Sequence, residues 1–116
     1  MKFRTGFVAA VAALAVAAPA FSADVNGTDS IDMLTGTRGA DVIQGLAGGD
    51  FLTGFRGHDV IRGGLGNDWI GGGYGHDRVF GNEDSDTVHG GIGHDTVYGQ
   101  AGDDVVAGDW GHDVVL

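Results

Sequence analysis

The sequence predicts an all-β solenoid of five stacked coils, in which each coil holds two short strands and two tight turns. Residues 27–116 divide into ten units of nine residues with no insertion or deletion, and glycine opens every unit. The sixth residue of every unit is aspartate, and the eighth is aliphatic. A fixed short period of this kind indicates a repeat protein whose units bury their apolar side chains only by stacking on their neighbours.

Each unit divides into a turn and a strand. The first six residues, such as 63–68, are expected to turn because glycine adopts a positive φ at little steric cost. The last three, such as 69–71, are expected to form a strand, whose eighth residue points inward because alternate side chains face opposite ways. Two units close one coil, so five coils give two parallel five-stranded sheets across a thin core. The ten inward residues are Leu34, Ile43, Leu52, Ile61, Ile70, Val79, Val88, Val97, Val106 and Val115.

Coiling places the aspartates of alternate units in two separate columns. One column holds Asp32, Asp50, Asp68, Asp86 and Asp104, and the other holds Asp41, Asp59, Asp77, Asp95 and Asp113. Neighbouring carboxylates in a column are about 4.8 Å apart, the spacing of adjacent strands, and repel each other by roughly 1 kcal/mol even in water. A hard dication such as calcium, which takes six to eight oxygen ligands, would neutralise them. One ion between each stacked pair of turns gives at most eight Ca²⁺ ions.

These units resemble the RTX family of haemolysin-type calcium-binding nonapeptide repeats, whose pattern is Gly-Gly-x-Gly-x-Asp-x-aliphatic-x. Units 63–71, 72–80 and 90–98 fit every fixed position, and the resemblance covers residues 27–116. It implies a parallel β-roll, with the ten aspartates as calcium ligands. It also implies carbonyl ligands from Gly36, Gly39, Gly45, Gly48, Gly54, Gly57, Gly63, Gly64, Gly66, Gly72, Gly73, Gly75, Gly90, Gly91, Gly93, Gly99, Gly102, Gly108 and Gly111.

The sequence departs from the family pattern in three ways. Seven units lack the second glycine, for example at Leu46 and Phe55. Ser30 and Asp84 replace the fourth glycine, which counts against the sites that use those two turns. Most family members carry a separate functional domain, and none is recognised in this sequence. The competing interpretation, a disordered glycine-rich segment, does not explain why aspartate and the aliphatic residue keep their places in all ten units.

Residues 1–22 have the features of a secretory signal peptide. Lys2 and Arg4 precede an alanine-rich apolar stretch, and small residues that suit cleavage follow it. The competing interpretation is an uncleaved membrane anchor, for which the stretch is short. Residues 23–26 are expected to be a short leader to the repeats. The protein is therefore expected to be secreted and extracellular.

The net charge argues against a nucleic-acid or anionic-lipid partner. After residue 22, sixteen acidic residues face four arginines, a net charge of −12. There is no cysteine to form a disulfide. We expect the metal-free chain to be largely unfolded, because glycine raises the entropy cost of folding and the carboxylates repel each other. Calcium binding would then be coupled to folding.

Four histidines, His58, His76, His94 and His112, occupy the fifth position of even-numbered units. One interpretation is that this turn position needs a positive φ, at which His, Asn and Asp are enriched. The other is a secondary metal site or a pH-sensing ladder.

Seven aromatic residues are expected to point outward without forming a ladder: Phe51, Phe55, Trp69, Tyr74, Phe80, Tyr98 and Trp110. They either cover their sheet or form a face that binds sugar or another partner. The sequence holds no catalytic motif, so an enzyme is not expected. We expect a structural or interaction role. The alternatives are a carbohydrate-binding accessory module and an extracellular calcium buffer. Apolar residues at the C-terminal end also predict end-to-end self-association.

Overall fold

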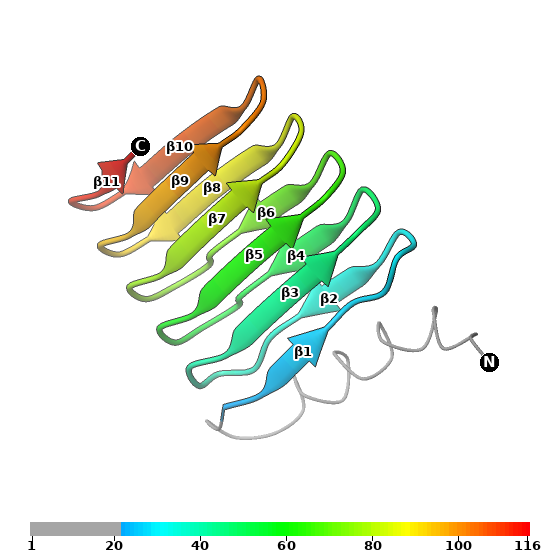
Figure 1. Cartoon of the computed structure of the whole chain (residues 1–116). Coiled ribbons are helices and arrows are strands. Elements are labelled where there is room, and N and C mark those ends of the chain that lie inside the picture. The colour runs from blue at the N-terminus through cyan, green and yellow to red at the C-terminus, as the bar shows by residue number, and fades with distance from the viewer. Residues whose placement is uncertain (1–21) are drawn as a thin grey trace.

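The structure, a computed structural model, describes residues 22–116 and confirms the predicted parallel β-roll. All regular elements in this range are strands, and they alternate between two facing sheets (Figure 1). The strands are β1 (Asp24–Asn26), β2 (Met33–Thr35), β3 (Val42–Leu46), β4 (Phe51–Thr53), β5 (Val60–Gly64), β6 (Trp69–Gly71), β7 (Arg78–Asn82), β8 (Thr87–Ile92), β9 (Thr96–Gln100), β10 (Val105–Trp110) and β11 (Val114–Val115).

One sheet has six strands in the order β1-β3-β5-β7-β9-β11, and the other has five in the order β10-β8-β6-β4-β2. All neighbouring strands are parallel, and their registers join residues 18 apart, such as Ile43 with Ile61 and Ile61 with Val79. The prediction of two five-stranded sheets was one strand short. The extra strand, β1, lies in the stretch expected to be a leader, and its Val25 pairs with Ile43.

The core is a thin double row of aliphatic side chains between the sheets. Eight of the ten predicted inward residues are at most 1% exposed, and Val25 of β1 joins them. Val106 is partly buried against this cluster, and Val115 is 45% exposed. Val115 differs because β11 is the last strand of its sheet, so no neighbouring strand covers its outer side. The core therefore holds the turns of successive coils in register.

Several strands are longer than the predicted three residues. β3, β5, β7 and β9 have five residues, and β8 and β10 have six. They extend into the next unit, where Leu46 still pairs with Gly64. Non-glycine residues at positive φ occur at the second or fourth position of a unit, as at Phe55 (80°) and Asp84 (74°). None of the fifth-position histidines is among them, so the explanation of those histidines by a positive φ was wrong.

Candidate metal centre

Each aspartate lies at the end of a turn, directly before the strand residue that enters the sheet, and the two predicted columns are present. The first four aspartates of each column are buried, at most 3% exposed: Asp32, Asp41, Asp50, Asp59, Asp68, Asp77, Asp86 and Asp95. Asp104 and Asp113, in the last coil, are partly exposed. A carboxylate is rarely buried to this extent unless a partner compensates its charge.

After the first aspartate of each column, one oxygen of every carboxylate accepts a hydrogen bond from the preceding aspartate of that column. Oδ1 of Asp59 accepts the backbone N–H of Asp41 at 2.8 Å, and Oδ1 of Asp77 accepts that of Asp59 at 2.8 Å. The same bond joins all eight stacked pairs of aspartates. Because these bonds hold Oδ1 against the neighbouring coil, they also fix the direction in which Oδ2 points.

The second oxygen has no hydrogen-bond partner in six of these residues. The buried oxygens without a partner are Oδ2 of Asp50, Asp59, Asp68, Asp77, Asp86 and Asp95. Leaving a buried polar atom unsatisfied costs roughly 1–3 kcal/mol, and more when the atom is charged. Such an atom in a native structure indicates a partner such as a bound ion. Three of these oxygens lie in each column, so the need for a partner repeats along both edges of the stack.

The first glycine of each unit leaves space beside this oxygen. A Cβ added at Gly45 would lie 2.5 Å from Oδ2 of Asp50 and 2.6 Å from the carbonyl oxygen of Gly63, one coil further on. At Gly63 the added Cβ would likewise lie 2.7 Å from the carbonyl oxygen of Gly81. A carboxylate oxygen and a carbonyl oxygen therefore approach the same point, and only glycine fits there. Both are hard oxygen donors of the type that calcium prefers.

Burial raises the pKa of the six aspartates whose Oδ2 has no partner, and neighbouring carboxylates of the same column add to the effect. The pKa of Asp59 rises to about 8, and those of Asp68, Asp77 and Asp86 rise to about 7. The pKa of Asp50 rises to about 6. The N–H bond to Oδ1 opposes these shifts but does not cancel them. Without a cation, Asp59 in the folded state therefore favours the protonated form at neutral pH, and Asp68, Asp77 and Asp86 are partly protonated there.

The candidate sites combine few carboxylates with many backbone groups. No group of three or more His, Asp or Glu side chains within residues 22–116 is arranged to hold a metal ion. A cation between two stacked turns would therefore meet two aspartates, and the glycine-rich backbone would supply the other oxygens.

Asp84, which replaces the fourth glycine of its unit, keeps the left-handed backbone conformation of that position. Its Oδ2 accepts the N–H of Gly66 at 2.8 Å.

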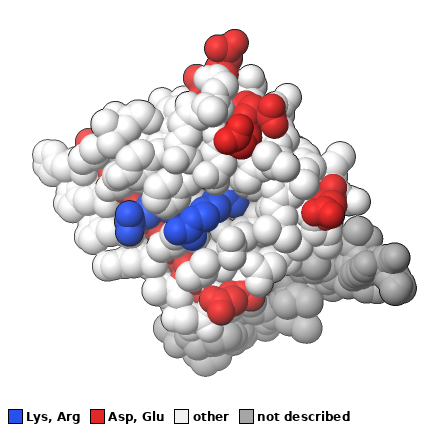
Figure 2. Space-filling view, viewed as in Figure 1, with Lys and Arg blue, Asp and Glu red and all other residues white. Residues whose placement is uncertain are grey.

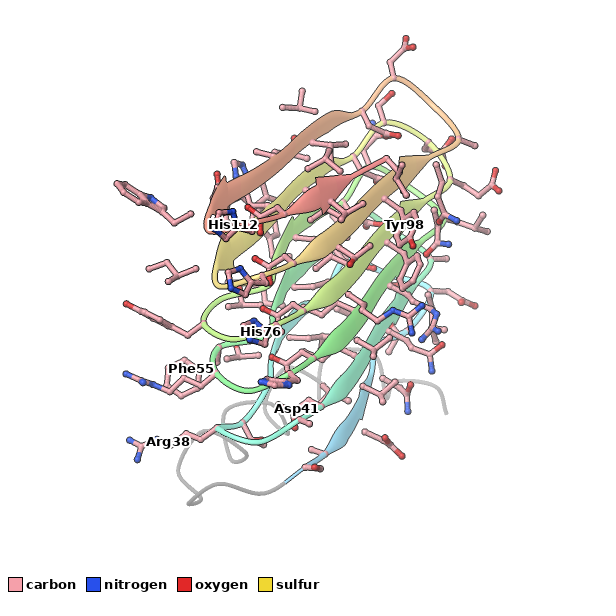
Figure 3. The ribbon with its side chains drawn as sticks, turned by 90° about the vertical axis from the view of Figure 1, so that its left-hand side faces the viewer. Arg38, Asp41, Phe55, His76, Tyr98 and His112 are labelled. Atoms are coloured by element: carbon pink, nitrogen blue, oxygen red, sulfur yellow. The ribbon has the colours of Figure 1, made fainter. Side chains whose placement is uncertain are left out.

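The four histidines form a ladder along one edge of the stack, as Figure 3 shows for His76 and His112. Neighbouring ring centroids are 4.9–5.3 Å apart. Nδ1 of His76 accepts the backbone N–H of His94 at 2.9 Å, and Nδ1 of His94 accepts that of His112 at 3.0 Å. Because Nδ1 is the acceptor, the ring proton of a neutral histidine lies on Nε2. These two bonds join neighbouring coils and use the Nδ1 lone pairs of His76 and His94.

The prediction that the outward aromatic residues form no ladder was wrong, because Phe80 and Tyr98 do form one. Their rings stack with centroids 4.8 Å apart and planes 1° apart. The guanidinium of Arg62 lies 5.3 Å from the centroid of Phe80. Figure 2 shows arginine side chains over the middle of this sheet face and acidic side chains towards its borders. On the turn edge, Arg38 and Phe55 point outward (Figure 3).

The predicted signal peptide lies almost wholly outside the described residues. Within residues 22–116, the structure contains no helix with the length and apolar character needed to cross a membrane.

The fold and its turns define a β-solenoid that buries a repeating array of carboxylates, and its oxygen donors fit a hard cation. A family model, the RTX calcium-binding nonapeptide repeat, matches residues 26–61, 53–88 and 80–115. The chain therefore belongs to the RTX family, whose repeats bind calcium and form a structural rather than a typically catalytic fold. No curated protein and no solved structure matches the chain significantly.

Proposed function

We propose that this protein is a secreted RTX protein that folds when calcium binds between its stacked turns, and that it serves a structural or interaction role. The observation that carries the proposal is the set of six buried Oδ2 atoms without a partner. They lie in the two aspartate columns, beside glycines that leave room for oxygen atoms alone. The ten sixth-position aspartates and the glycine carbonyls are the proposed ligands.

The proposed coupling to folding follows from the cost of the buried charges. The bound cation would supply positive charge shared between two aspartates of neighbouring coils. The chain supplies the alignment, because each N–H···Oδ1 bond fixes one oxygen and leaves the other towards the site. Without the cation, carboxylates about 4.8 Å apart repel one another. Folding then requires either protonation or a cation.

The proposed location outside the cell fits this chemistry. Extracellular calcium modules bind with a Kd on the order of 10⁻⁴–10⁻³ M, so such repeats stay loose in a calcium-poor cytoplasm and fold after export. The sequence of residues 1–22 supports export by a signal peptide.

The test is far-UV circular dichroism of the purified protein, titrated with calcium from a chelated start at neutral pH. We expect a cooperative change from a disordered to a β spectrum near millimolar calcium, and no equal change with magnesium, which demands near-ideal octahedral geometry. A β spectrum that is the same in chelator and in calcium would refute the coupling of folding to calcium.

Glycan binding is the second candidate, and exposed aromatic rings favour it. Trp69 is 44% exposed and Trp110 is 75% exposed, so both offer surface to a sugar. Phe80 is less suitable, because Arg62 and Tyr98 already contact its ring. Binding of a polysaccharide that is lost in Trp69→Ala or Trp110→Ala would support this role. The calcium-buffer and self-association roles stay predictions.

A further inference from the structure

The turns of the first two units differ in conformation from those that follow. From the third unit onward, the second residue has a positive φ, whether it is glycine, as at Gly64 (99°), or not, as at Leu46 (76°). The first two units have Thr28 and Thr37 at this position, and neither has a positive φ. A β-branched residue strongly disfavours that region, so threonine fixes a different turn.

In the second unit this turn directs two donors of Thr37 at the aspartate. The backbone N–H of Thr37 donates to Oδ2 of Asp41 at 2.5 Å, and the hydroxyl lies 2.8 Å from Oδ1 and 3.0 Å from Oδ2. The N–H of Gly39 donates to the same hydroxyl oxygen at 3.0 Å. The N–H of Ala23 donates to Oδ1 of Asp41 at 2.8 Å. Both oxygens of this buried carboxylate are therefore satisfied by the protein itself.

The first unit repeats the arrangement. The N–H of Thr28 donates to Oδ2 of Asp32 at 2.6 Å, and its hydroxyl lies 2.9 Å from the same oxygen. The N–H of Ser30 donates to the Thr28 hydroxyl at 3.1 Å. Ser30, which departs from the family pattern, thus belongs to a different type of turn.

The remaining buried aspartates show the opposite state. Asp50 and Asp59, the next members of the two columns, have an Oδ2 without a hydrogen-bond partner, as do the four buried aspartates that follow them. The contrast coincides with the change of the second residue from threonine to a residue at positive φ. The second residue therefore decides whether the carboxylate is satisfied from within the turn or left open to a cation.

We propose that Thr28 and Thr37 take the place of the cation, so that Asp32 and Asp41 leave the set of ten proposed ligands, the first coil needs no calcium and the protein binds six ions rather than eight. This inference rests on the proposed function. A site between stacked turns needs the Oδ2 of its first aspartate, which the threonines occupy in the pairs Asp32–Asp50 and Asp41–Asp59. The six other pairs each begin with an open Oδ2. The first coil is then a metal-independent base on which the calcium-dependent coils assemble.

The experiment counts calcium ions by equilibrium dialysis of the full chain at saturating calcium. We expect six ions for the unchanged protein. The double variant Thr28→Gly, Thr37→Gly frees both oxygens and permits the left-handed turn, so it should bind eight. The control Thr28→Val, Thr37→Val removes the hydroxyls but keeps the backbone N–H and the β-branch, so it should stay at six.

Eight ions in the unchanged protein, or a folded glycine variant that still binds six, would overturn the inference and leave the proposed function intact. A chain that binds no calcium would refute the proposed function itself. If the glycine variant fails to fold, the count for the unchanged protein decides alone.

Discussion

The substitution Asp77→Asn should change stability in opposite directions with and without calcium. Oδ1 of Asp77 accepts the N–H of Asp59 at 2.8 Å, and an asparagine oxygen can accept the same bond. What changes is the buried Oδ2, which has no partner. Burial raises the pKa of Asp77 from 3.8 to about 7. This rise in the pKa means that, above pH 7, ionised Asp77 destabilises the folded state by about 4 kcal/mol relative to the unfolded state.

Without calcium, the neutral asparagine should therefore stabilise the fold at pH 8 by up to about 4 kcal/mol. With calcium the sign reverses, because Asp77 belongs to two stacked pairs, with Asp59 and with Asp95. Removing its charge should weaken both sites, so the number of bound ions should fall by two and the calcium midpoint for folding should rise.

The assay is circular dichroism at pH 8, first in chelator with an osmolyte that drives folding, and then in calcium with urea. The Asp77→Asn substitution should lower the osmolyte concentration needed in chelator and lower the urea midpoint in calcium. The control is Asp103→Asn, which removes the same charge from an exposed residue and should change stability by at most about 0.5 kcal/mol. If Asp77→Asn is less stable than the unchanged protein in both conditions, the unpartnered Oδ2 of Asp77 does not destabilise the metal-free fold.

Three further predictions follow. Gly45→Ala should weaken calcium binding, because the added Cβ would lie 2.5 Å from Oδ2 of Asp50. In the control Gly71→Ala, the atom nearest to the added Cβ is 3.7 Å away. Equal midpoints of the calcium titration for the two variants would contradict this prediction. The pKa values of the central aspartates are raised to about 6–8. In chelator, the free energy of unfolding should therefore be highest below pH 4 and should fall as the pH rises from 6 to 8. Better folding at pH 8 than at pH 5 would contradict this prediction. Ile61→Ala should lower the free energy of unfolding, measured with urea, by about 2–5 kcal/mol. The side chain of Leu65 is 57% exposed, so Leu65→Ala should lower it far less. Similar losses for the two variants would place the core elsewhere.

The repeat period predicted the fold well because one rule governs every coil. Aspartate and the aliphatic residue recur every nine residues, so their columns follow from the closure of one coil by two units. The same arithmetic could have found two features that were missed. Val25 lies nine residues before Leu34 and is the inward residue of β1, although Ala23 stands where an aspartate would be. Phe80 and Tyr98 are 18 residues apart and therefore stack.

Other features could not be read from the period, because they depend on backbone conformation. The positive φ falls at the second and fourth positions rather than at the fifth, and no count of residues locates it. The role of Thr28 and Thr37 depends on the same choice, since their N–H reaches Oδ2 only when φ is negative. The sequence showed a missing glycine there, and the structure shows a hydrogen-bond donor in its place.

The spacing of 18 residues between bonded partners also limits how the gene can change length. The bonds between aspartates and between histidines join residues 18 apart, and paired strands keep a register of 18 residues. Losing or duplicating 18 residues removes or adds one coil and leaves every remaining partner in register. Losing nine residues between His58 and His76 instead moves all later units to the opposite sheet, so His76 would no longer follow His58 along one edge. Length variants that keep the histidine ladder should therefore differ by multiples of 18 residues.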